Sequence, residues 1–269
     1  MNRFTIRNFI ENGEIAASKK DTLGIAAPHC HEFYEIEYVI SGDGDYTVDG
    51  ERYSVGRGMF FLMTPANFHE VRGESCRGYN VMFSERACDN ELLARCIVGK
   101  QHSVFSVNED DRAIFEAFFE ELCKNQSSPL YSSCLLNAIL HKIISYGQND
   151  QSRPDYVARA ILYLLGHFRE NPSLCDVAAQ VGYTPTYFSA VFKRDVGESY
   201  KEYLDRLRFD YAKKLIISSR LSIAQICKES GFDDYPNFIR RFKARFSLSP
   251  GEMRQGCTQI INPKSEVSQ

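Results

Sequence analysis

The sequence predicts an α+β protein with two domains, a β-rich barrel followed by an all-helical domain. Residues 35–63 contain short β-rich runs separated by turn residues. From Asp155 to about Gln255, the apolar residues instead recur at helical spacing. Within this helical part, one pattern occurs at residues 173–202 and again at 222–252. A length of 269 residues is enough for two such domains.

The barrel prediction rests on four short runs rich in β-branched and aromatic residues. Asp49-Gly50, between the second and third runs, is a strong signal for a two-residue hairpin. Several short strands at this spacing are typical of a sandwich or barrel. The runs are Glu35–Ile40, Gly44–Val48, Arg52–Val55 and Met59–Met63.

Two amphipathic helices should follow the barrel, near 108–125 and 130–147, because apolar residues such as Phe115 and Phe119 recur at helical spacing. The polar stretch before Asp155 has the composition of a linker. The predicted organisation is a barrel at 1–105, helices at 106–148, a linker at 149–154, a helical domain at 155–257 and a disordered tail at 258–269.

The repeat in the helical domain has a physical reason at each position. Ser173 and Ser222 are N-cap residues, each followed three residues later by an acid or amide, as in a capping box. Gly182 and Gly231 then stand where the chain must turn sharply, and the second copy has one extra residue in its turn.

A second helix should follow each glycine, near 185–196 and 235–246. One face of each helix carries phenylalanines four residues apart, and the opposite face carries Lys and Arg. Helix, turn and helix with a basic outer face is the arrangement of a helix-turn-helix motif. A helix at 200–218 joins the copies, and its length of about 29 Å is close to the spacing of about 34 Å between successive major-groove segments on one face of DNA.

The charge distribution agrees with DNA binding by the second half alone. The net charge is −3 overall, but residues 1–154 carry 15 Lys/Arg against 22 Asp/Glu, whereas residues 155–257 carry 16 against 12. The cysteines are odd in number and lack C-x-x-C spacing, which argues against a zinc ribbon or a secreted disulfide framework. We see neither a signal peptide nor an apolar run long enough for a membrane span, and we expect a cytoplasmic protein without membrane contact.

Residues 156–254 resemble the AraC/XylS family of bacterial regulators in both the order and the spacing of their motifs. Two departures from the family pattern, Cys227 and Met253, are both apolar. The motifs are Val177-Ala178…Gly182-Tyr183, Tyr187-Phe188…Phe192-Lys193, Arg206-Leu207…Ala212…Leu215-Ile216 and Ile226…Gly231-Phe232…Phe238…Phe242-Lys243…Ser249-Pro250…Arg254.

The resemblance implies which side chains meet DNA. Arg240 is the base-facing side chain able to make a bidentate contact to guanine. The implied base-facing residues are Thr186, Ser189 and Ala190 in the first recognition helix and Tyr235, Pro236 and Arg240 in the second, and the implied phosphate contacts are Lys193, Arg194 and Lys243.

The first half is similar to the cupin-like effector domain of the same family. His29-Cys-His31…Glu35, followed by Gly42, matches the first cupin motif, and Gly58…His69 approximates the second. The helices at 106–148 occupy the place of the family's dimerisation helices. The residues expected to bind the effector are His29, His31, Glu35, His69 and Tyr79, and Asn80, next to Tyr79, is expected to line the same site.

The histidines allow two interpretations. Three histidines and Glu35 are a plausible ligand set for a divalent metal, and the alternative function is a cupin metalloenzyme or metal sensor. We favour a polar effector pocket with little or no metal, no cofactor and no catalytic residue, because an enzyme has no need of two matched recognition helices.

The sequence therefore predicts a ligand-responsive, sequence-specific transcription regulator, not an enzyme, that senses a small metabolite such as a sugar. The expected partners are double-stranded DNA, the effector, a second copy of the chain and RNA polymerase.

Overall fold

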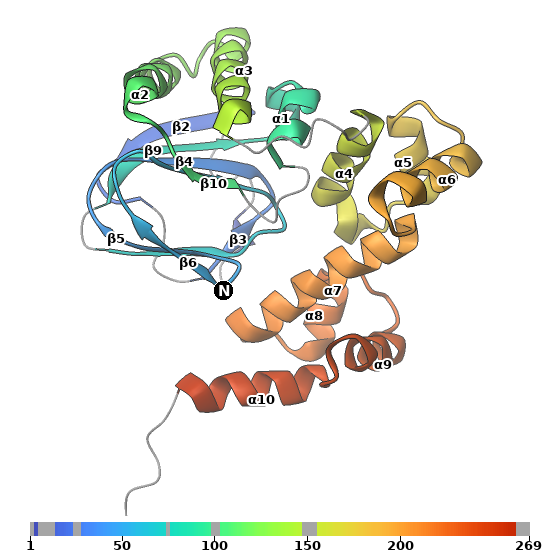
Figure 1. Cartoon of the computed structure of the whole chain (residues 1–269). Helices are drawn as coiled ribbons and strands as arrows, with labels where there is room; N and C mark the ends of the chain where they lie inside the picture. Colours follow the sequence, from blue (N-terminus) through green and yellow to red (C-terminus); the bar gives the residue numbers. More distant parts are fainter. Residues whose placement is uncertain are drawn as a thin grey trace, which may run out of the picture.

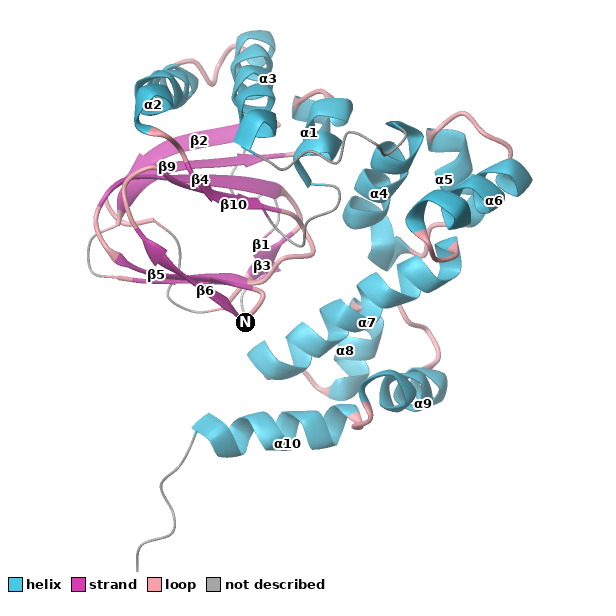
Figure 2. Cartoon of the chain, in the orientation of Figure 1, coloured by secondary structure: helices cyan, strands magenta, loops and turns pink. Residues whose placement is uncertain are grey.

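A β-rich domain and a helical domain make up the chain, as the sequence predicts (Figure 1). The computed structural model describes residues 3–4, 14–23, 28–73, 76–97, 103–146 and 155–261. Figure 2 shows that the strands gather in the first domain and that the second is entirely helical. Among the described residues, no helix has the length and apolar character needed to span a membrane.

Two antiparallel sheets face each other in the first domain. The five-stranded sheet has the order β10-β7-β4-β9-β2, and the three-stranded sheet has the order β6-β5-β8. A short parallel pair, β1 and β3, lies beside them. The strands are β1 Arg3–Phe4, β2 Ile15–Lys20, β3 Cys30–His31, β4 Tyr34–Ser41, β5 Gly44–Val48, β6 Glu51–Val55, β7 Met59–Met63, β8 His69–Arg72, β9 Arg77–Phe83 and β10 Ser103–Ser106.

Alternation along β4 divides its side chains between two environments, because successive residues of a strand point to opposite faces of the sheet. Ile36 and Tyr38 join the hydrophobic cluster under the helices. Val39 joins the cluster inside the barrel, where Tyr46 stacks on Phe61 with ring centroids 3.8 Å apart. Glu35 and Glu37 alternate with Ile36 and Tyr38 and therefore face the barrel interior.

Helices α2 (Glu109–Lys124) and α3 (Pro129–Tyr146) cover the outer face of the five-stranded sheet (Figure 1). Phe115 and Phe119 of α2 are fully buried and stack on Tyr38 at 6.2 and 5.4 Å. A further helix, α1 (Asn90–Ile97), follows the short η2 turn (Glu85–Ala87), and the sequence analysis did not anticipate it.

The second domain follows the repeat. Ser173, Ser199 and Ser222 form capping boxes, and Gly182 and Gly231 have positive φ angles of 74° and 81°, as the sequence predicts. The elements are α4 Asp155–His167, η3 Phe168–Glu170, α5 Leu174–Gln180, α6 Pro185–Val196, α7 Tyr200–Ser218, α8 Ile223–Glu229, α9 Tyr235–Phe246 and α10 Pro250–Ile261.

The last helix is longer than predicted. α10 reaches Ile261, so residues 258–261, which were expected to be a disordered tail, are helical. Its cap at Ser249 starts the helix, and the sequence has no further proline until Pro263. Residues 262–269 and the predicted linker at 149–154 lie outside the described residues.

The two domains contact each other along α7 and α4. Lys214 Nζ of α7 lies 2.7 Å from Asp49 Oδ1 and donates a hydrogen bond of 2.8 Å to the carbonyl oxygen of Ala66. Tyr211 packs on Phe68, with ring centroids 5.6 Å apart. These contacts fix α7 against the loops that join strands β5 to β6 and β7 to β8.

Candidate effector site and nucleic-acid interface

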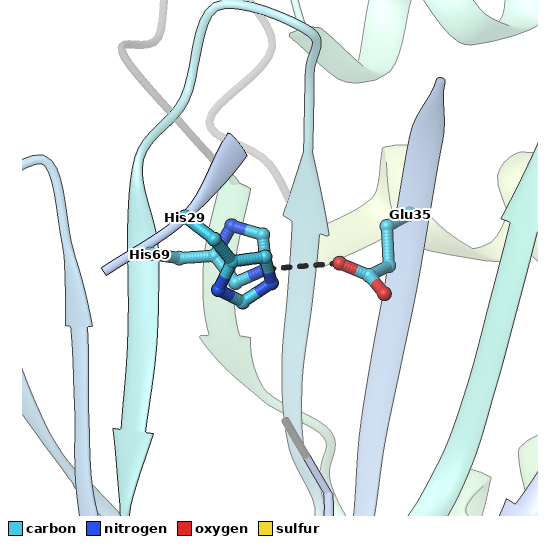
Figure 3. Close-up of side chains that lie close together, drawn as sticks. All are labelled: His29, Glu35 and His69. Atoms are coloured by element: carbon cyan, nitrogen blue, oxygen red, sulfur yellow. Dashed lines mark ion pairs between the residues drawn. The ribbon is translucent and has the colours of Figure 1, made fainter. Parts of the chain in front are cut away.

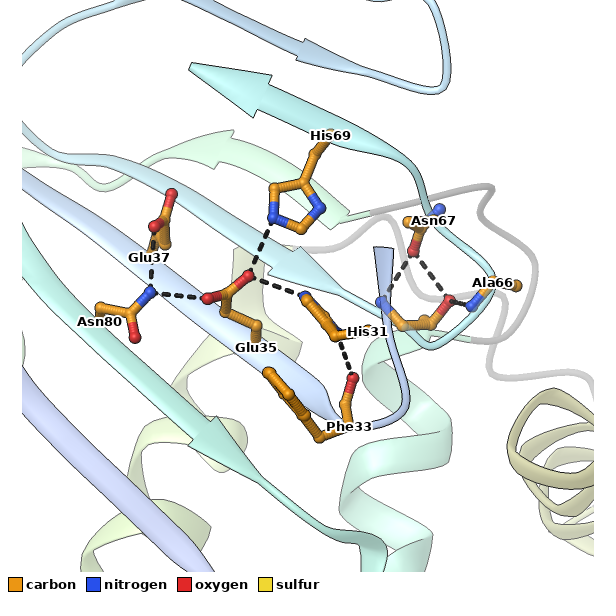
Figure 4. Close-up of polar contacts among 9 residues, drawn as sticks. His31, Phe33, Glu35, Glu37, Ala66, Asn67, His69 and Asn80 are labelled. Atoms are coloured by element: carbon orange, nitrogen blue, oxygen red, sulfur yellow. Dashed lines mark hydrogen bonds and ion pairs between the residues drawn. The ribbon is translucent and has the colours of Figure 1, made fainter. Parts of the chain in front are cut away.

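Buried polar side chains gather at one end of the barrel interior (Figure 4). His31 comes from β3, Glu35 from β4 and His69 from β8, and all are at most 6% exposed. His29 joins them because its backbone forms an antiparallel bridge with His69, with both hydrogen bonds at 3.1 Å. The structure therefore brings together the four residues that the sequence analysis selected from two separate motifs.

Glu35 is the centre of this cluster. Its Oε2 atom lies 2.8 Å from His31 Nε2 and 3.0 Å from His69 Nε2, and its Oε1 atom accepts a hydrogen bond of 2.7 Å from Asn80. Burial alone would raise the pKa of this carboxyl group, but the charge and hydrogen bond of His31, together with the nearby His69, hold the pKa well below its usual value. Glu35 is therefore an ionised carboxylate inside the barrel.

His31 fixes the orientation of Glu35. Its Nδ1 atom lies 2.7 Å from the carbonyl oxygen of Phe33, and its Nε2 atom contacts the carboxylate. The two contacts hold the imidazole ring between the backbone of Phe33 and the carboxylate of Glu35. His31 therefore helps to hold Glu35 in place.

Glu37 and Tyr46 also line the polar end of the interior, and the sequence analysis did not select them. Asn80 Nδ2 donates to Glu37 Oε1 at 3.0 Å. Burial, followed by the charge of Glu37, raises the pKa of Tyr46 well above its usual value. The signal for Glu37 was available, because residues two apart on a strand share a face and Glu37 follows Glu35 by two.

Of the residues predicted to bind the effector, Tyr79 does not join the polar cluster in the barrel. Tyr79 lies on the opposite face of β9 from Asn80, stacks on Phe119 of α2 at 5.4 Å and has Lys19 over its ring. Strand alternation is the physical reason: of two neighbouring residues only one faces the barrel interior, and here it is Asn80.

The first candidate DNA-reading surface is the outer face of α6. Thr186, Ala190, Lys193 and Arg194 are exposed and Ser189 is half-buried, and all five line one shallow hollow with Leu174 and Pro185. Phe188 and Phe192 are fully buried on the opposite face of the helix. The neighbouring Tyr187 is 54% exposed, and the sequence analysis did not select it as a DNA contact.

The second candidate surface is the outer face of α9, where Tyr235, Pro236, Arg240 and Lys243 are all exposed. The Nη2 atom of Arg240 donates a hydrogen bond of 2.7 Å to Asn237 Oδ1 on the same helix. Asn237, which is half-buried and was not selected from the sequence, lies beside Arg240 on this helix.

Not every arginine of the recognition helices is available for DNA. Arg194 donates to Asp195 Oδ2 at 2.8 Å and lies 3.4 Å from the hydroxyl group of Tyr156. On α9, Arg241 pairs with Asp205 of α7. These pairs tie the recognition helices to their own domain, and a phosphate would have to compete with Asp195 for Arg194.

The comparisons with known proteins assign both domains. Residues 13–142 match the family described as AraC-like ligand binding domain, and residues 177–256 match the family described as Helix-turn-helix domain. Together these matches cover strands β2 to β10, helices α1 and α2, most of α3 and most of both helix-turn-helix units.

Relatives with the same arrangement are regulators. The uncharacterized HTH-type transcriptional regulator YfiF of Bacillus subtilis is 27% identical over 84% of this chain and 78% of its own length. The arabinose operon regulatory protein of Salmonella typhimurium is 26% identical over 83% of this chain and 84% of its own length. A solved AraC-type transcriptional regulator from Chromobacterium violaceum matches 39% of this chain and 93% of its own, at 27% identity and a TM-score of 0.37.

A ligand-binding barrel joined to two helix-turn-helix units defines a DNA-binding transcription regulator. In both domains the chain is similar to AraC-type regulators, which confirms the resemblance seen in the sequence.

Proposed function

We propose that this regulator binds a small polar metabolite, such as a sugar, in its barrel and reads DNA through α6 and α9. The observation that carries the proposal is the pairing of a buried polar cluster around Glu35 with two exposed recognition helices in one chain. A sugar supplies many hydroxyl groups, which match a buried set of carboxylate, amide and imidazole groups. The Salmonella relative is named for the arabinose operon, which supports the same class of effector.

The proposed base contacts are those of Thr186, Ser189 and Ala190 on α6 and of Tyr235, Pro236 and Arg240 on α9. Lys193, Arg194 and Lys243 are the proposed phosphate contacts. Exposure of eight of these nine side chains, and half-exposure of Ser189, supports these roles. Because α7 has 19 residues, or about 29 Å of helix, both helices can reach adjacent major-groove segments.

Selection from random duplexes tests DNA reading by the full chain. The enriched sequences should contain two conserved blocks whose centres lie about 10 base pairs apart, one for each recognition helix. The variant Arg240→Ala should relax one block and leave the other unchanged. Enrichment of a single block, unaffected by this variant, would contradict reading by α9.

The effector signal should pass to the DNA-binding domain through α7. Two contacts connect the barrel cluster to α7. Phe68, the residue before His69, packs on Tyr211, and Asp49 pairs with Lys214. Lys214→Ala should therefore weaken the effect of the sugar on DNA affinity while effector affinity in the barrel is preserved. The matched control is Lys213→Ala, since Lys213 lies over the ring of Phe246 in the second domain.

We further propose that α2 and α3 mediate a homodimer. Leu130 is 79% exposed, Tyr131 43% and Ile114 41%, although all three are apolar or aromatic. Light scattering should find a dimer for the full chain and a monomer for Leu130→Glu. The control is Leu248→Glu, which changes a side chain 46% exposed in the second domain and should leave the dimer intact.

The proposed setting is the cytoplasm, where DNA and RNA polymerase are accessible, and the proposed mode of action is binding without catalysis. A thermal-shift screen of the full chain against sugars and small acids tests the effector class. A bound effector raises the melting temperature because it stabilises the native state. The effect should disappear in Glu35→Gln; a sugar that stabilises both proteins equally would place its site outside the barrel cluster.

A further inference from the structure

The strongest unexplained feature of the barrel is His69. Its side chain is 2% exposed, and neither ring nitrogen makes a hydrogen bond within the described part of the chain. Buried polar groups in native proteins are nearly always hydrogen-bonded or coordinate an ion. A buried imidazole with two unsatisfied nitrogens therefore indicates that a further group belongs at this position.

The spacing of His69 and Glu35 identifies the nature of that group. His69 Nε2 lies 3.0 Å from Glu35 Oε2, yet the ring N–H does not point at the oxygen as a hydrogen bond requires. Two ligand atoms held at about 2.1 Å from one metal ion lie roughly 3–4 Å apart. The observed separation fits two ligands of a shared cation.

His29 supplies a third donor. The antiparallel bridge between His29 and His69 holds their backbones together, and their ring centroids lie 4.2 Å apart. One possible ligand atom from each of His29, Glu35 and His69 lies within 4.8 Å of the others (Figure 3). The ligand atoms lie slightly farther apart than they would around a bound ion, and small rotations of the three side chains would bring them to that distance.

The surroundings prepare these groups for coordination. His31 and Asn80 hold the carboxylate from either side at 2.8 and 2.7 Å. Such outer hydrogen bonds orient metal ligands in known sites.

We propose that His29, Glu35 and His69 bind one divalent transition-metal ion, with Zn²⁺ as the probe. Two imidazoles and one carboxylate are a recognised ligand set for zinc, and three protein ligands leave a coordination position open. This proposal differs from the sequence-based expectation of little or no metal. A bound ion does not imply that the protein is an enzyme. Metal binding does not depend on the proposed function. A further step, in which an oxygen atom of the effector takes the open coordination position, does rest on the proposed function.

Metal titration of the full chain tests the proposal. After removal of metal with a chelator, the protein should bind about one equivalent of Zn²⁺ by calorimetry and should melt at a higher temperature. Co²⁺ should give an absorption spectrum of nitrogen and oxygen ligation, without the sulfur charge-transfer bands that the free cysteines would produce. His69→Gln and Glu35→Gln should each lower Zn²⁺ affinity at least tenfold, in line with the loss of a ligand.

The matched control is His141→Gln, since His141 is an exposed histidine on α3 and should leave the stoichiometry unchanged. DNA binding by each variant shows that it has folded. Less than about a tenth of an equivalent of Zn²⁺ in the wild type, or equal binding by wild type and both site variants, would overturn the metal site. Either result leaves the effector proposal standing, because the thermal-shift screen with sugars can be repeated in the presence of a chelator, where no metal is bound.

Discussion

The two helix-turn-helix units have the same framework and different surfaces. Phe188 of α6 and Phe238 of α9 occupy equivalent positions, and both are fully buried. Two positions later on each helix, however, the first unit exposes Ala190 and the second exposes Arg240. The buried face is fixed by packing, whereas packing places no demand on the exposed face, which is therefore available to differ with the DNA that each unit reads.

The units also differ in their neighbours. α4, which supports the first unit, packs against α1 of the barrel domain, and His167 at its end lies 3.4 Å from Glu85. The turn of the second unit instead packs on η3, where Gly231 lies against the backbone of Arg169. The first unit is thus attached to the barrel domain through α4, and the second is attached to the first through η3 and α7.

The largest expected effect tests the shared framework. Phe188→Ala and Phe238→Ala should each destabilise the protein by about 3–5 kcal/mol, since each leaves a cavity in the core. The two losses should agree closely because both rings are fully buried beside a second phenylalanine, at 5.3 Å and 5.7 Å. Urea denaturation followed by circular dichroism measures them. A loss below about 1 kcal/mol at either site would show that the copies do not share a core.

The next effect tests the different surfaces. Arg240→Ala should cost about 1–3 kcal/mol of affinity for the selected DNA and much less for a scrambled duplex, because a bidentate contact to guanine discriminates between bases. Lys243→Ala should weaken both duplexes alike and reduce the salt slope by about one. Fluorescence anisotropy at two salt concentrations separates the two roles. Equal losses on both duplexes for Arg240→Ala would remove its base-reading role.

A smaller effect distinguishes the two turns. Gly182→Ala should cost about 1–2 kcal/mol, because alanine resists the positive φ angle. A Cβ atom at Gly182 would meet nothing within 4 Å, whereas at Gly231 it would lie 2.9 Å from the carbonyl oxygen of Arg169. Gly231→Ala should therefore cost more than Gly182→Ala in the same urea titration. If the two variants are equally stable, the contact with η3 is not rigid.

The smallest effect concerns the attachment of the first unit to the barrel domain. The hydrogen bond to Glu85 raises the pKa of His167 to about 9, although burial opposes the shift and Glu170 adds to it. The unfolded pKa is about 6.5, so the contribution of this pair to stability should be complete below that pH and should disappear as the pH rises through the folded value. An NMR titration of His167 measures the pKa, and Glu85→Gln should lower it. An unchanged pKa in that variant would assign the shift to Glu170.

Much of the second domain could be predicted from the sequence because its signals are local. Ser173 and Ser222 cap helices within three residues of themselves, and Gly182 and Gly231 take their positive φ angles within their own turns. The joining helix has the predicted bounds, Tyr200–Ser218, since its apolar residues recur at helical spacing. In the barrel, the central strands could be predicted from their β-rich runs, but α1 could not, because its eight residues are too few for a clear periodicity signal.

The sequence by itself therefore determined the two-domain fold, the repeated helix-turn-helix units and the residue types of the barrel cluster. The tertiary structure alone decided that Asn80 and Glu37 face Glu35 while Tyr79 faces α2, because the pleat admits every second residue to the interior. It also decided the pairing of Lys214 with Asp49, two residues far apart in the chain. Local signals follow from the backbone of a few residues, whereas such contacts depend on how whole elements pack.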